Sequence, residues 1–373
     1  MLPLNYVVFI PYGFLFFFIT IFGAVYSLRS RHWLGAWVGL EINLIAFIPI
    51  ILYRGIVLET ESAIKYFIFQ AVGSALIIFR RLLRFGLDFT WDLSINDSSF
   101  LVFKGIFILR IGLFLKLGVF PFHMWFPSVI AGLSWFARFL LLTWQKIAPL
   151  FLLFFISYMW GSQIIFFLLL IAAGSRLVGG IGGINQTQLR ALLAYSSIAH
   201  LGWIVFCCFL REARLEAYFG IYFFISLCIF LVIWNIEVNL VFQAFSSFFG
   251  RNVIARFSFI LFFLSLGGIP PLLGFAPKWM VLNLGRERNL FFILIILIIG
   301  SLLRLFYYLS LIFSSFFSSS SVFFKELNFS ENNYFLNIIL VVGTGLNLFG
   351  GLIFLDNFFI ERFLYAMGLF NKS

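Results

Sequence analysis

The sequence predicts an all-α, polytopic transmembrane helix bundle. Of the 373 residues, 63% are hydrophobic and only 10% are charged, and the mean hydropathy is +1.10. A soluble globular protein carries roughly a quarter charged residues. No soluble core could bury 57 phenylalanines, so lipid must be the solvent for much of this chain. Apolar runs near the ~20 residues that cross a bilayer as a helix recur along the chain.

These apolar runs predict about eleven helices, separated by short polar breaks. Backbone polar groups in lipid require helices or a closed barrel, and long uninterrupted runs differ from the alternating pattern of barrel strands. The expected helices are Leu4–Tyr26, Trp33–Tyr53, Ser62–Phe79, Phe100–Phe120, Leu133–Tyr158, Ile164–Ile181, Leu192–Leu210, Tyr218–Phe242, Phe257–Leu284, Phe291–Phe313 and Tyr334–Phe354. No break is long enough for a soluble catalytic domain, so residues 1–373 are expected to form a single integral membrane domain.

Charge and cysteine patterns exclude several classes of function. The formal net charge is +11, but the arginines lie mostly in short breaks between apolar runs, which is typical of membrane topology. A nucleic-acid-binding protein would cluster them on one soluble face, so no nucleic-acid partner is expected. The cysteines Cys207, Cys208 and Cys228 lie in apolar runs without the spacing of a metal site. The sequence also lacks nucleotide-binding motifs, so neither a metal nor a cofactor is expected in this chain.

Five ionisable residues lie within runs that are otherwise apolar, namely Glu41, Lys65, Lys116, Lys146 and Lys278. An ionisable side chain at bilayer depth costs about 3 kcal/mol or more. Such a group usually faces a polar interior, has a partner and marks the path of an ion or a proton. These positions are therefore the first candidates for a functional site.

Two of the expected helices are interrupted. In FLKLGVFPFHMWFP, Pro121 follows Lys116 by five residues, and in LSLGGIPPLLGFAPKWM, Pro270 and Pro271 follow two glycines and precede Lys278. Proline removes a backbone donor, and an interrupted helix at membrane depth is tolerated only against protein or a wet cavity. Simple proline kinks would explain the prolines but not the adjacent lysines. Paired interruptions, one in each half, indicate a transporter built from inverted repeats.

The candidate residues lie in long sequence blocks. The blocks are WVGLEINLIAFIP around Glu41, ESAIKYFIFQAVGS around Lys65, FLKLGVFPFHMWFP around Lys116, LLLTWQKIAPL around Lys146, GGINQTQLRALLAYSSIAHLGW from Gly182 to Trp203, and LSLGGIPPLLGFAPKWM from Leu264 to Met280. These blocks resemble the chain 2 family of mitochondrial NADH:ubiquinone oxidoreductase, the antiporter-like membrane subunits of respiratory complex I. The resemblance implies an antiporter-like core over about residues 33–284. The C-terminal helices, residues 290–373, are generic.

The resemblance implies roles for individual residues in a proton path. Glu41 and Lys116 correspond to the family's pair of one carboxylate and one ammonium on neighbouring helices. Lys146 corresponds to the central lysine, and Lys278 to the lysine of the second broken helix.

Four further residues are candidates for the relay between these sites. His200 and His123 are expected to link the charged residues, because histidine changes its charge near neutral pH. Lys65 lies in a matching block, and Glu237 lies within an apolar run beside two asparagines. The alternative for Glu237 is to cap an internal hydrogen-bond network.

The physics of buried charges explains how such a set of residues could pass protons along. A lysine in a low-dielectric site holds its proton less tightly, and a nearby carboxylate strengthens that hold. Moving one charge therefore changes the proton affinity of the next site, so a row of sites can load and release protons in turn. A single buried lysine has the alternative reading of a structural ion pair.

The resemblance also implies the setting of the chain. It would be a multi-pass subunit of the mitochondrial inner membrane and an obligate hetero-oligomer with other membrane-arm subunits and lipids. NADH, flavin mononucleotide (FMN), iron–sulfur clusters and ubiquinone would bind elsewhere in the complex. Two alternatives remain: a free-standing cation/proton antiporter subunit, and a structural spacer that does not pump.

The sequence also predicts where other charged and aromatic residues lie. Arg110 is expected either to pair within the bundle or to point to a neighbour, and Arg304 to lie at the interface or against a partner. Tryptophan concentrates at membrane–water interfaces. The residues expected in these belts are Trp33, Trp37, Trp91, Trp125 and Trp279.

Overall fold

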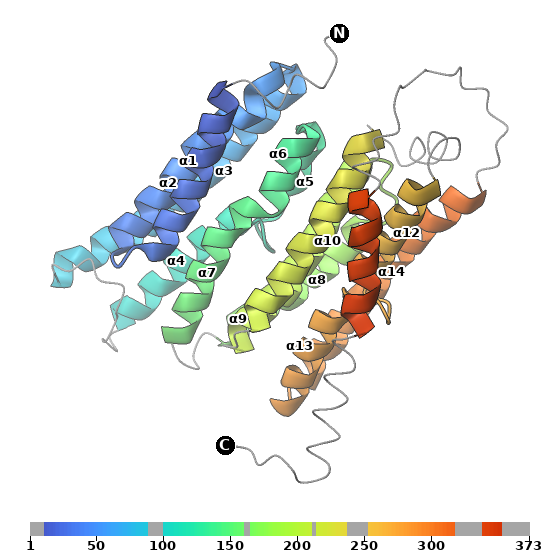
Figure 1. Cartoon of the computed structure of the whole chain (residues 1–373). Helices are drawn as coiled ribbons and strands as arrows, with labels where there is room; N and C mark the ends of the chain where they lie inside the picture. Colours follow the sequence, from blue (N-terminus) through green and yellow to red (C-terminus); the bar gives the residue numbers. More distant parts are fainter. Residues whose placement is uncertain are drawn as a thin grey trace. The chain divides into compact units, whose positions relative to one another are not determined.

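The computed structural model describes residues 11–88, 100–159, 165–210, 214–236, 253–317 and 338–352, which form helices and no β-strand (Figure 1). The helices are α1 (Pro11–Arg29), α2 (Trp33–Ile51), the 3-10 turn η2 (Leu52–Arg54), α3 (Val57–Asp88), α4 (Phe100–Leu117), α5 (Trp125–Gly132), α6 (Trp135–Leu142), α7 (Trp144–Met159), α8 (Ile165–Gly182), α9 (Leu189–Leu210), α10 (Arg214–Ile236), α12 (Val253–Gly267), α13 (Phe275–Glu287), α14 (Phe291–Phe317) and the helix Ile338–Leu352. Six segments within these ranges are long and apolar enough to cross a membrane. The all-α, polytopic prediction is confirmed.

The chain divides into two compact units. The first contains Met1–Val178 and Leu193–Arg211, and the second contains Gly179–Leu192 and Glu212–Ser373. The interrupted helix α4–α5 lies in the first unit and the interrupted helix α12–α13 in the second. Each unit therefore holds one of the two breaks, and the single integral domain stays a prediction.

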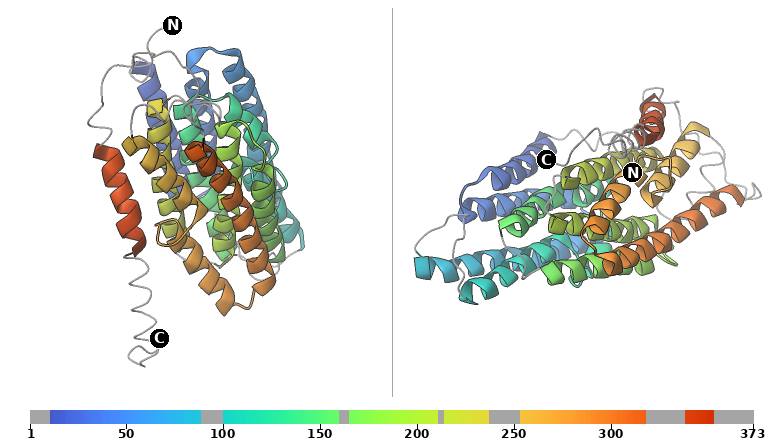
Figure 2. Two further views of the ribbon diagram at one scale, coloured as in Figure 1. Left: turned by 90° about the vertical axis from the view of Figure 1, so that its right-hand side faces the viewer. Right: turned by 90° about the horizontal axis from the view of Figure 1, so that it is seen from below.

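Glycines bring pairs of helices in the first unit into close contact. α1 and α2 run side by side, as do α3 and α4 (Figure 2). A Cβ atom on Gly23 of α1 would lie 2.8 Å from the Asn43 backbone nitrogen, and one on Gly39 of α2 would lie 2.6 Å from the Ser27 backbone nitrogen. Small residues that let helix backbones approach are typical of membrane helix packing.

Both predicted helix breaks are present, and both begin with the same type of helix end. α4 ends just before Gly118 and α12 just before Gly268, and both glycines have positive φ values of 67° and 82°. The Gly118 amide donates to Phe114 O at 2.9 Å, and the Gly268 amide donates to Leu264 O at 3.0 Å. A left-handed glycine that turns its amide back to the last helical carbonyls is a common helix end.

The chain also resumes its helix at matching places after both breaks. A cis peptide bond precedes Pro121 in the first break and Pro271 in the second. Four residues after each of these prolines a new helix starts, at Trp125 and at Phe275. The two segments differ in the position of their lysine. Lys116 lies before the first break, and Lys278 lies after the second.

Several helix boundaries differ from those predicted. The expected helix Leu133–Tyr158 is divided at Thr143 into α6 and α7, where the Thr143 hydroxyl donates to Phe139 O at 2.7 Å. Threonine bonds to a carbonyl of the preceding turn often bend helices. The eight-residue helix α5 was not predicted, because a search for spanning-length apolar runs passes over so short a helix.

Two tryptophans expected in the interfacial belts lie inside the first unit instead. Trp33 is 2% exposed and Trp125 is 3% exposed, so the belt prediction is wrong for both. Trp125 stacks on Phe69 of α3 with ring centroids 5.9 Å apart and an interplanar angle of 18°. Its ring therefore fixes α5 against α3 just after the first break.

Candidate functional site

Lys116 lies in the last turn of α4 and is buried, with 6% of its surface exposed. The half-buried Glu41 of α2 interacts electrostatically with the Lys116 ammonium and with the Tyr66 hydroxyl of α3. Among the described residues these two charges form no direct ion pair. The structure therefore brings the predicted carboxylate of α2 and ammonium of α4 within electrostatic range of each other without joining them, and α3 packs against both helices.

The neighbouring helix α3 makes room for Lys116 and binds its backbone. A Cβ atom on Gly73 would lie 2.9 Å from Lys116 Cγ and 3.0 Å from Gly112 O, so only glycine fits there without displacement. One turn earlier, Gln70 Nε2 donates to Lys116 O at 3.1 Å. This bond satisfies one of the carbonyls that the end of α4 leaves without a helical partner.

Replacing Gln70 with methionine is expected to destabilise the protein. The Lys116 carbonyl would lose its buried donor, and an unsatisfied buried polar group costs about 1–3 kcal/mol. Thermal denaturation in detergent would detect the loss. Thr60→Val is the control, because that hydroxyl is exposed and bonds, among the described residues, only to Val57 O in its own helix. Equal denaturation temperatures for Gln70→Met and Thr60→Val would contradict the role of Gln70.

A chain of neutral polar side chains connects three helices around this region. Gln145 Nε2 of α7 donates to Asn43 Oδ1 of α2 at 3.0 Å, and the Tyr66 hydroxyl of α3 donates to Gln145 Oε1 at 3.3 Å. Gln145 directly precedes Lys146, and Asn43 lies two residues after Glu41. Sequence reasoning missed these hydrogen-bonded side chains, although the amide residues close to Glu41 and Lys146 in the sequence were a usable signal.

Lys146 lies in the first turn of α7 with 3% of its surface exposed. Among the described residues its ammonium has no hydrogen-bond partner, and it lies 4.5 Å from the ring centroid of Phe126. A cation over an aromatic face is stabilised by the ring quadrupole. Phe126 also contacts the first break, because a Cβ atom on Gly118 would lie 3.2 Å from Phe126 Cβ. One aromatic side chain thus connects the buried ammonium to the break.

The two histidines expected to relay protons are both buried in the first unit. His123 lies within the first break, is 8% exposed and donates from Nδ1 to Pro121 O at 3.2 Å. His200 lies on α9 and is 5% exposed. Arg176 of α8 donates to Ala199 O at 3.1 Å, so α8 is tied to α9 one residue before His200. The relay through either histidine stays a prediction.

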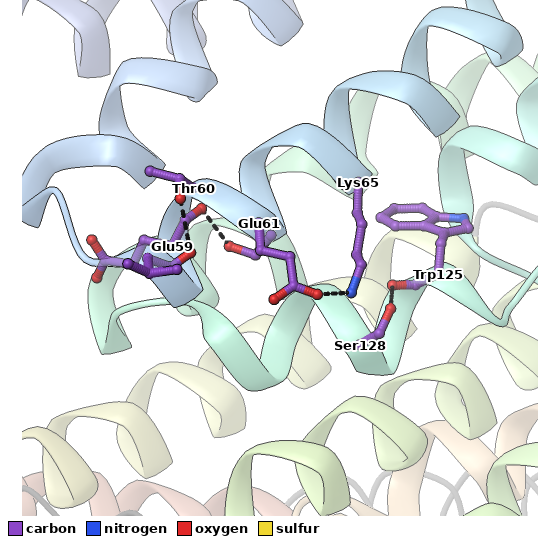
Figure 3. Close-up of polar contacts among 8 residues, drawn as sticks. Glu59, Thr60, Glu61, Lys65, Trp125 and Ser128 are labelled. Carbon is purple, nitrogen blue, oxygen red and sulfur yellow. Dashed lines mark hydrogen bonds and ion pairs between the residues drawn. The ribbon is translucent and has the colours of Figure 1, made fainter.

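Lys65 has a different environment from the other candidate lysines. It is 42% exposed and forms an ion pair with Glu61, which is 57% exposed, one turn earlier on α3 (Figure 3). The structure therefore does not bring Lys65 into the buried set, and its role in a relay stays a prediction. Glu237 lies outside the described residues.

In the second unit, Lys278 of α13 is 5% exposed and reaches back across the break. Its ammonium donates to Leu266 O at 3.0 Å and to Gly267 O, the last carbonyls of α12. The negative end of a helix dipole favours cations at this place. A lysine positioned after the break thus lies against the end of the helix before it.

A second cation, which sequence reasoning misplaced, shares this site. Arg304 of α14 is fully buried, and its Nη2 donates to Leu266 O at 2.7 Å. The expected interfacial position of Arg304 is therefore wrong. The helix end attracts the guanidinium inward, and an isolated arginine in an apolar run gave no sign of that distant acceptor. Lys278 and Arg304 consequently share one carbonyl oxygen.

Comparison with known sequences identifies relatives of the chain. Residues 30–304 match the family described as "NADH:quinone oxidoreductase/Mrp antiporter, TM". NADH-ubiquinone oxidoreductase chain 2 of Anopheles gambiae is 41% identical over 281 residues, which cover 75% of this chain and 79% of that protein. Chain 2 of Osphranter robustus is 38% identical over 274 residues, covering 73% and 76% of the two chains.

Solved structures share the fold. A chain of respiratory complex I from Thermus thermophilus matches with a TM-score of 0.79 and 23% identity, over 92% of this chain and 78% of that one. A chain of the Mrp complex from Dietzia matches with a TM-score of 0.79 and 16% identity, over 91% and 75%. Sequence, helix breaks and fold agree, and the chain belongs to the NADH-ubiquinone oxidoreductase chain 2 family.

Proposed function

We propose that this chain is a core membrane-arm subunit of the respiratory NADH:ubiquinone oxidoreductase and contributes to proton translocation coupled to electron transfer from NADH to ubiquinone. The observation that carries the proposal is the pair of buried lysines, Lys116 and Lys146, on either side of one helix break. Buried charges are costly, and apolar residues of similar size would serve a purely structural role as well or better. A proton path gives a reason to keep both lysines.

Each member of the set has a separate task in this proposal. Glu41 stabilises the protonated form of Lys116, so the pair forms a loading site. Lys146 is the central site, held by the Phe126 ring and without a hydrogen-bond partner among the described residues. Charges interact strongly where the dielectric constant is low, so a proton leaving one site changes the energy of the next. Lys278 is the corresponding site of the second unit.

The family membership of the chain supports a proposal about its setting. We infer that it works in the mitochondrial inner membrane as an obligate partner of other membrane-arm subunits. NADH, FMN, the iron–sulfur clusters and ubiquinone would bind to those other subunits. The task of this chain is then to respond to electrostatic or conformational change that arrives from the redox reaction.

Replacing Lys116 with methionine tests the proposal. Complexes carrying this variant are expected to assemble and to translocate fewer protons per NADH oxidised, because the Glu41 site can no longer bind a transferable proton. The measurement is the change in pH inside liposomes that contain the purified complex, after NADH and ubiquinone are added. Arg286→Gln is the control, since it removes an exposed cation at the end of α13.

Two outcomes would favour other functions. An unchanged proton yield in an assembled Lys116→Met complex would favour the structural spacer. A chain that migrates apart from NADH dehydrogenase activity on native gels of the inner membrane would favour the free-standing antiporter.

A further inference from the structure

One charged pair lies on the outer face of the first unit, within a membrane-spanning segment. Glu61 and Lys65 lie in the candidate span Val57–Arg80, and both side chains are substantially exposed, at 57% and 42%. Lys65 is eight residues after the start of α3, which places it about 12 Å along the helix axis. Lys65, the deeper member of the pair, is therefore just over two helical turns inside the segment, and Glu61 lies one turn before it.

The surroundings of this pair are apolar. Exposed hydrophobic side chains precede and follow it along α3, with 48% to 60% of their surface exposed: Leu58, Ile64, Ile68 and Val72. Lipid tails can cover these residues, but they offer no partner to a carboxylate or an ammonium. By contrast, α14 exposes apolar residues such as Phe292 and Phe306, and its one arginine is buried. The outer face of α3 thus differs from an ordinary lipid-facing surface.

The polar surface extends from α3 to α5. α5 packs directly on α3, since a Cβ atom on Gly132 would lie 2.6 Å from Leu58 O. Figure 3 shows Lys65 beside Trp125 and Ser128 of α5, and Ser128 is exposed. We call Glu61, Lys65 and Ser128 the outer polar patch. The patch lies beside the helix that resumes the chain after the first break.

The internal ion pair leaves much of the patch's bonding capacity unused. An ammonium has three donors and a carboxylate has about four acceptor positions, whereas among the described residues the Glu61–Lys65 pair uses one of each. The Ser128 hydroxyl donates to Trp125 O at 2.8 Å and retains its own acceptor positions. A partner that brings hydrogen-bonding side chains to this surface would satisfy groups that hydrocarbon leaves bare.

We propose that the outer polar patch binds a transmembrane helix of a neighbouring membrane subunit, and that this helix presents hydroxyl, amide or carboxylate side chains to it. The inference rests on the proposed function, in which the chain works within a hetero-oligomeric membrane complex. Because α5 begins at the first break, a helix seated on the patch contacts the segment that carries Phe126 toward Lys146. The patch therefore assigns Lys65 to subunit contact instead of the buried proton path.

Two double variants test this interface. Glu61→Leu with Lys65→Leu makes the face fully apolar, and Glu61→Lys with Lys65→Glu keeps the internal pair but reverses its direction. Both are expected to loosen the chain from the complex, by about threefold in the dissociation constant for each interhelical hydrogen bond lost. The measurement is the fraction of the chain that stays with NADH dehydrogenase activity on native gels as dodecyl maltoside is increased. Glu287→Gln, an exposed carboxylate at the end of α13, is the control.

The contrary result is also well defined. If the face meets only lipid or another part of this chain, both variants will stay with the complex as firmly as the unaltered chain, and the proposal is overturned. Should the leucine variant fail to accumulate in the membrane, the reversed pair decides alone. The unaltered chain provides a separate test of the proposed function. If the unaltered chain is absent from the gel band with NADH dehydrogenase activity, the proposed function is rejected, and not only the interface.

Discussion

Replacing Lys146 with methionine is expected to lower NADH-driven proton translocation through this chain by about a hundredfold or more, because a positioned proton-transfer group typically contributes about 10²–10⁴-fold. Methionine fills a similar volume but binds no proton, so the central site of the first unit would be lost. The measurement is proton uptake into liposomes containing the purified complex. Leu153→Met is the matched control, because it places methionine at another buried position of α7.

The same substitution is expected to leave the protein as stable as before or more stable. The Lys146 ammonium is buried and has only the Phe126 ring as a stabilising contact among the described residues. Exchanging buried ionic groups for apolar ones of similar volume is often neutral or stabilising by about 1–4 kcal/mol. Thermal denaturation in detergent measures this effect. A variant that loses both stability and pumping would point to a structural role for Lys146.

Replacing Gly268 with alanine is expected to disable the second unit, for two independent reasons. Its φ of 82° lies in the left-handed region, where a Cβ atom costs about 1–2 kcal/mol. That Cβ atom would also overlap Lys278 Nζ, which occupies the space that glycine leaves open. The lysine must then leave the carbonyls of Leu266 and Gly267, and proton translocation is expected to fall with it.

The adjacent glycine offers a matched control. A Cβ atom on Gly267 would meet Leu305 Cδ1 at 3.5 Å, an ordinary contact, so Gly267→Ala should leave translocation unchanged. The loss caused by Gly268→Ala should also add little to that of Lys278→Met, because both act on one side chain. Fully additive losses in the double variant would show that Gly268 acts elsewhere.

Local chemistry explains which features could be predicted from the sequence. Glycine and proline determine helix ends within a few residues, so both breaks were located correctly. Charges in apolar runs are costly enough to indicate buried positions, and Lys116, Lys146 and Lys278 are indeed buried. Lys65 has the same sequence signature but an exposed ion pair, because burial depends on which face of α3 meets its neighbours.

Features that depend on distant partners could not be predicted. The Gln145 side chain bonds to Asn43, which lies 102 residues away in the chain, and Arg304 bonds to Leu266 O across 38 residues. Neither acceptor is recognisable from its local sequence. The assignment of a proton path to the buried lysines remains a prediction, since burial and proximity describe an arrangement and not a movement of protons.

The carbonyl that Lys278 and Arg304 share has a consequence for the charge at the end of α12. Arginine keeps its charge at any physiological pH, so the end of α12 never becomes neutral. If Lys278 exchanges a proton, the site alternates between two positive charges and one. The shared carbonyl therefore holds one permanent positive charge beside a second charge that a proton can switch.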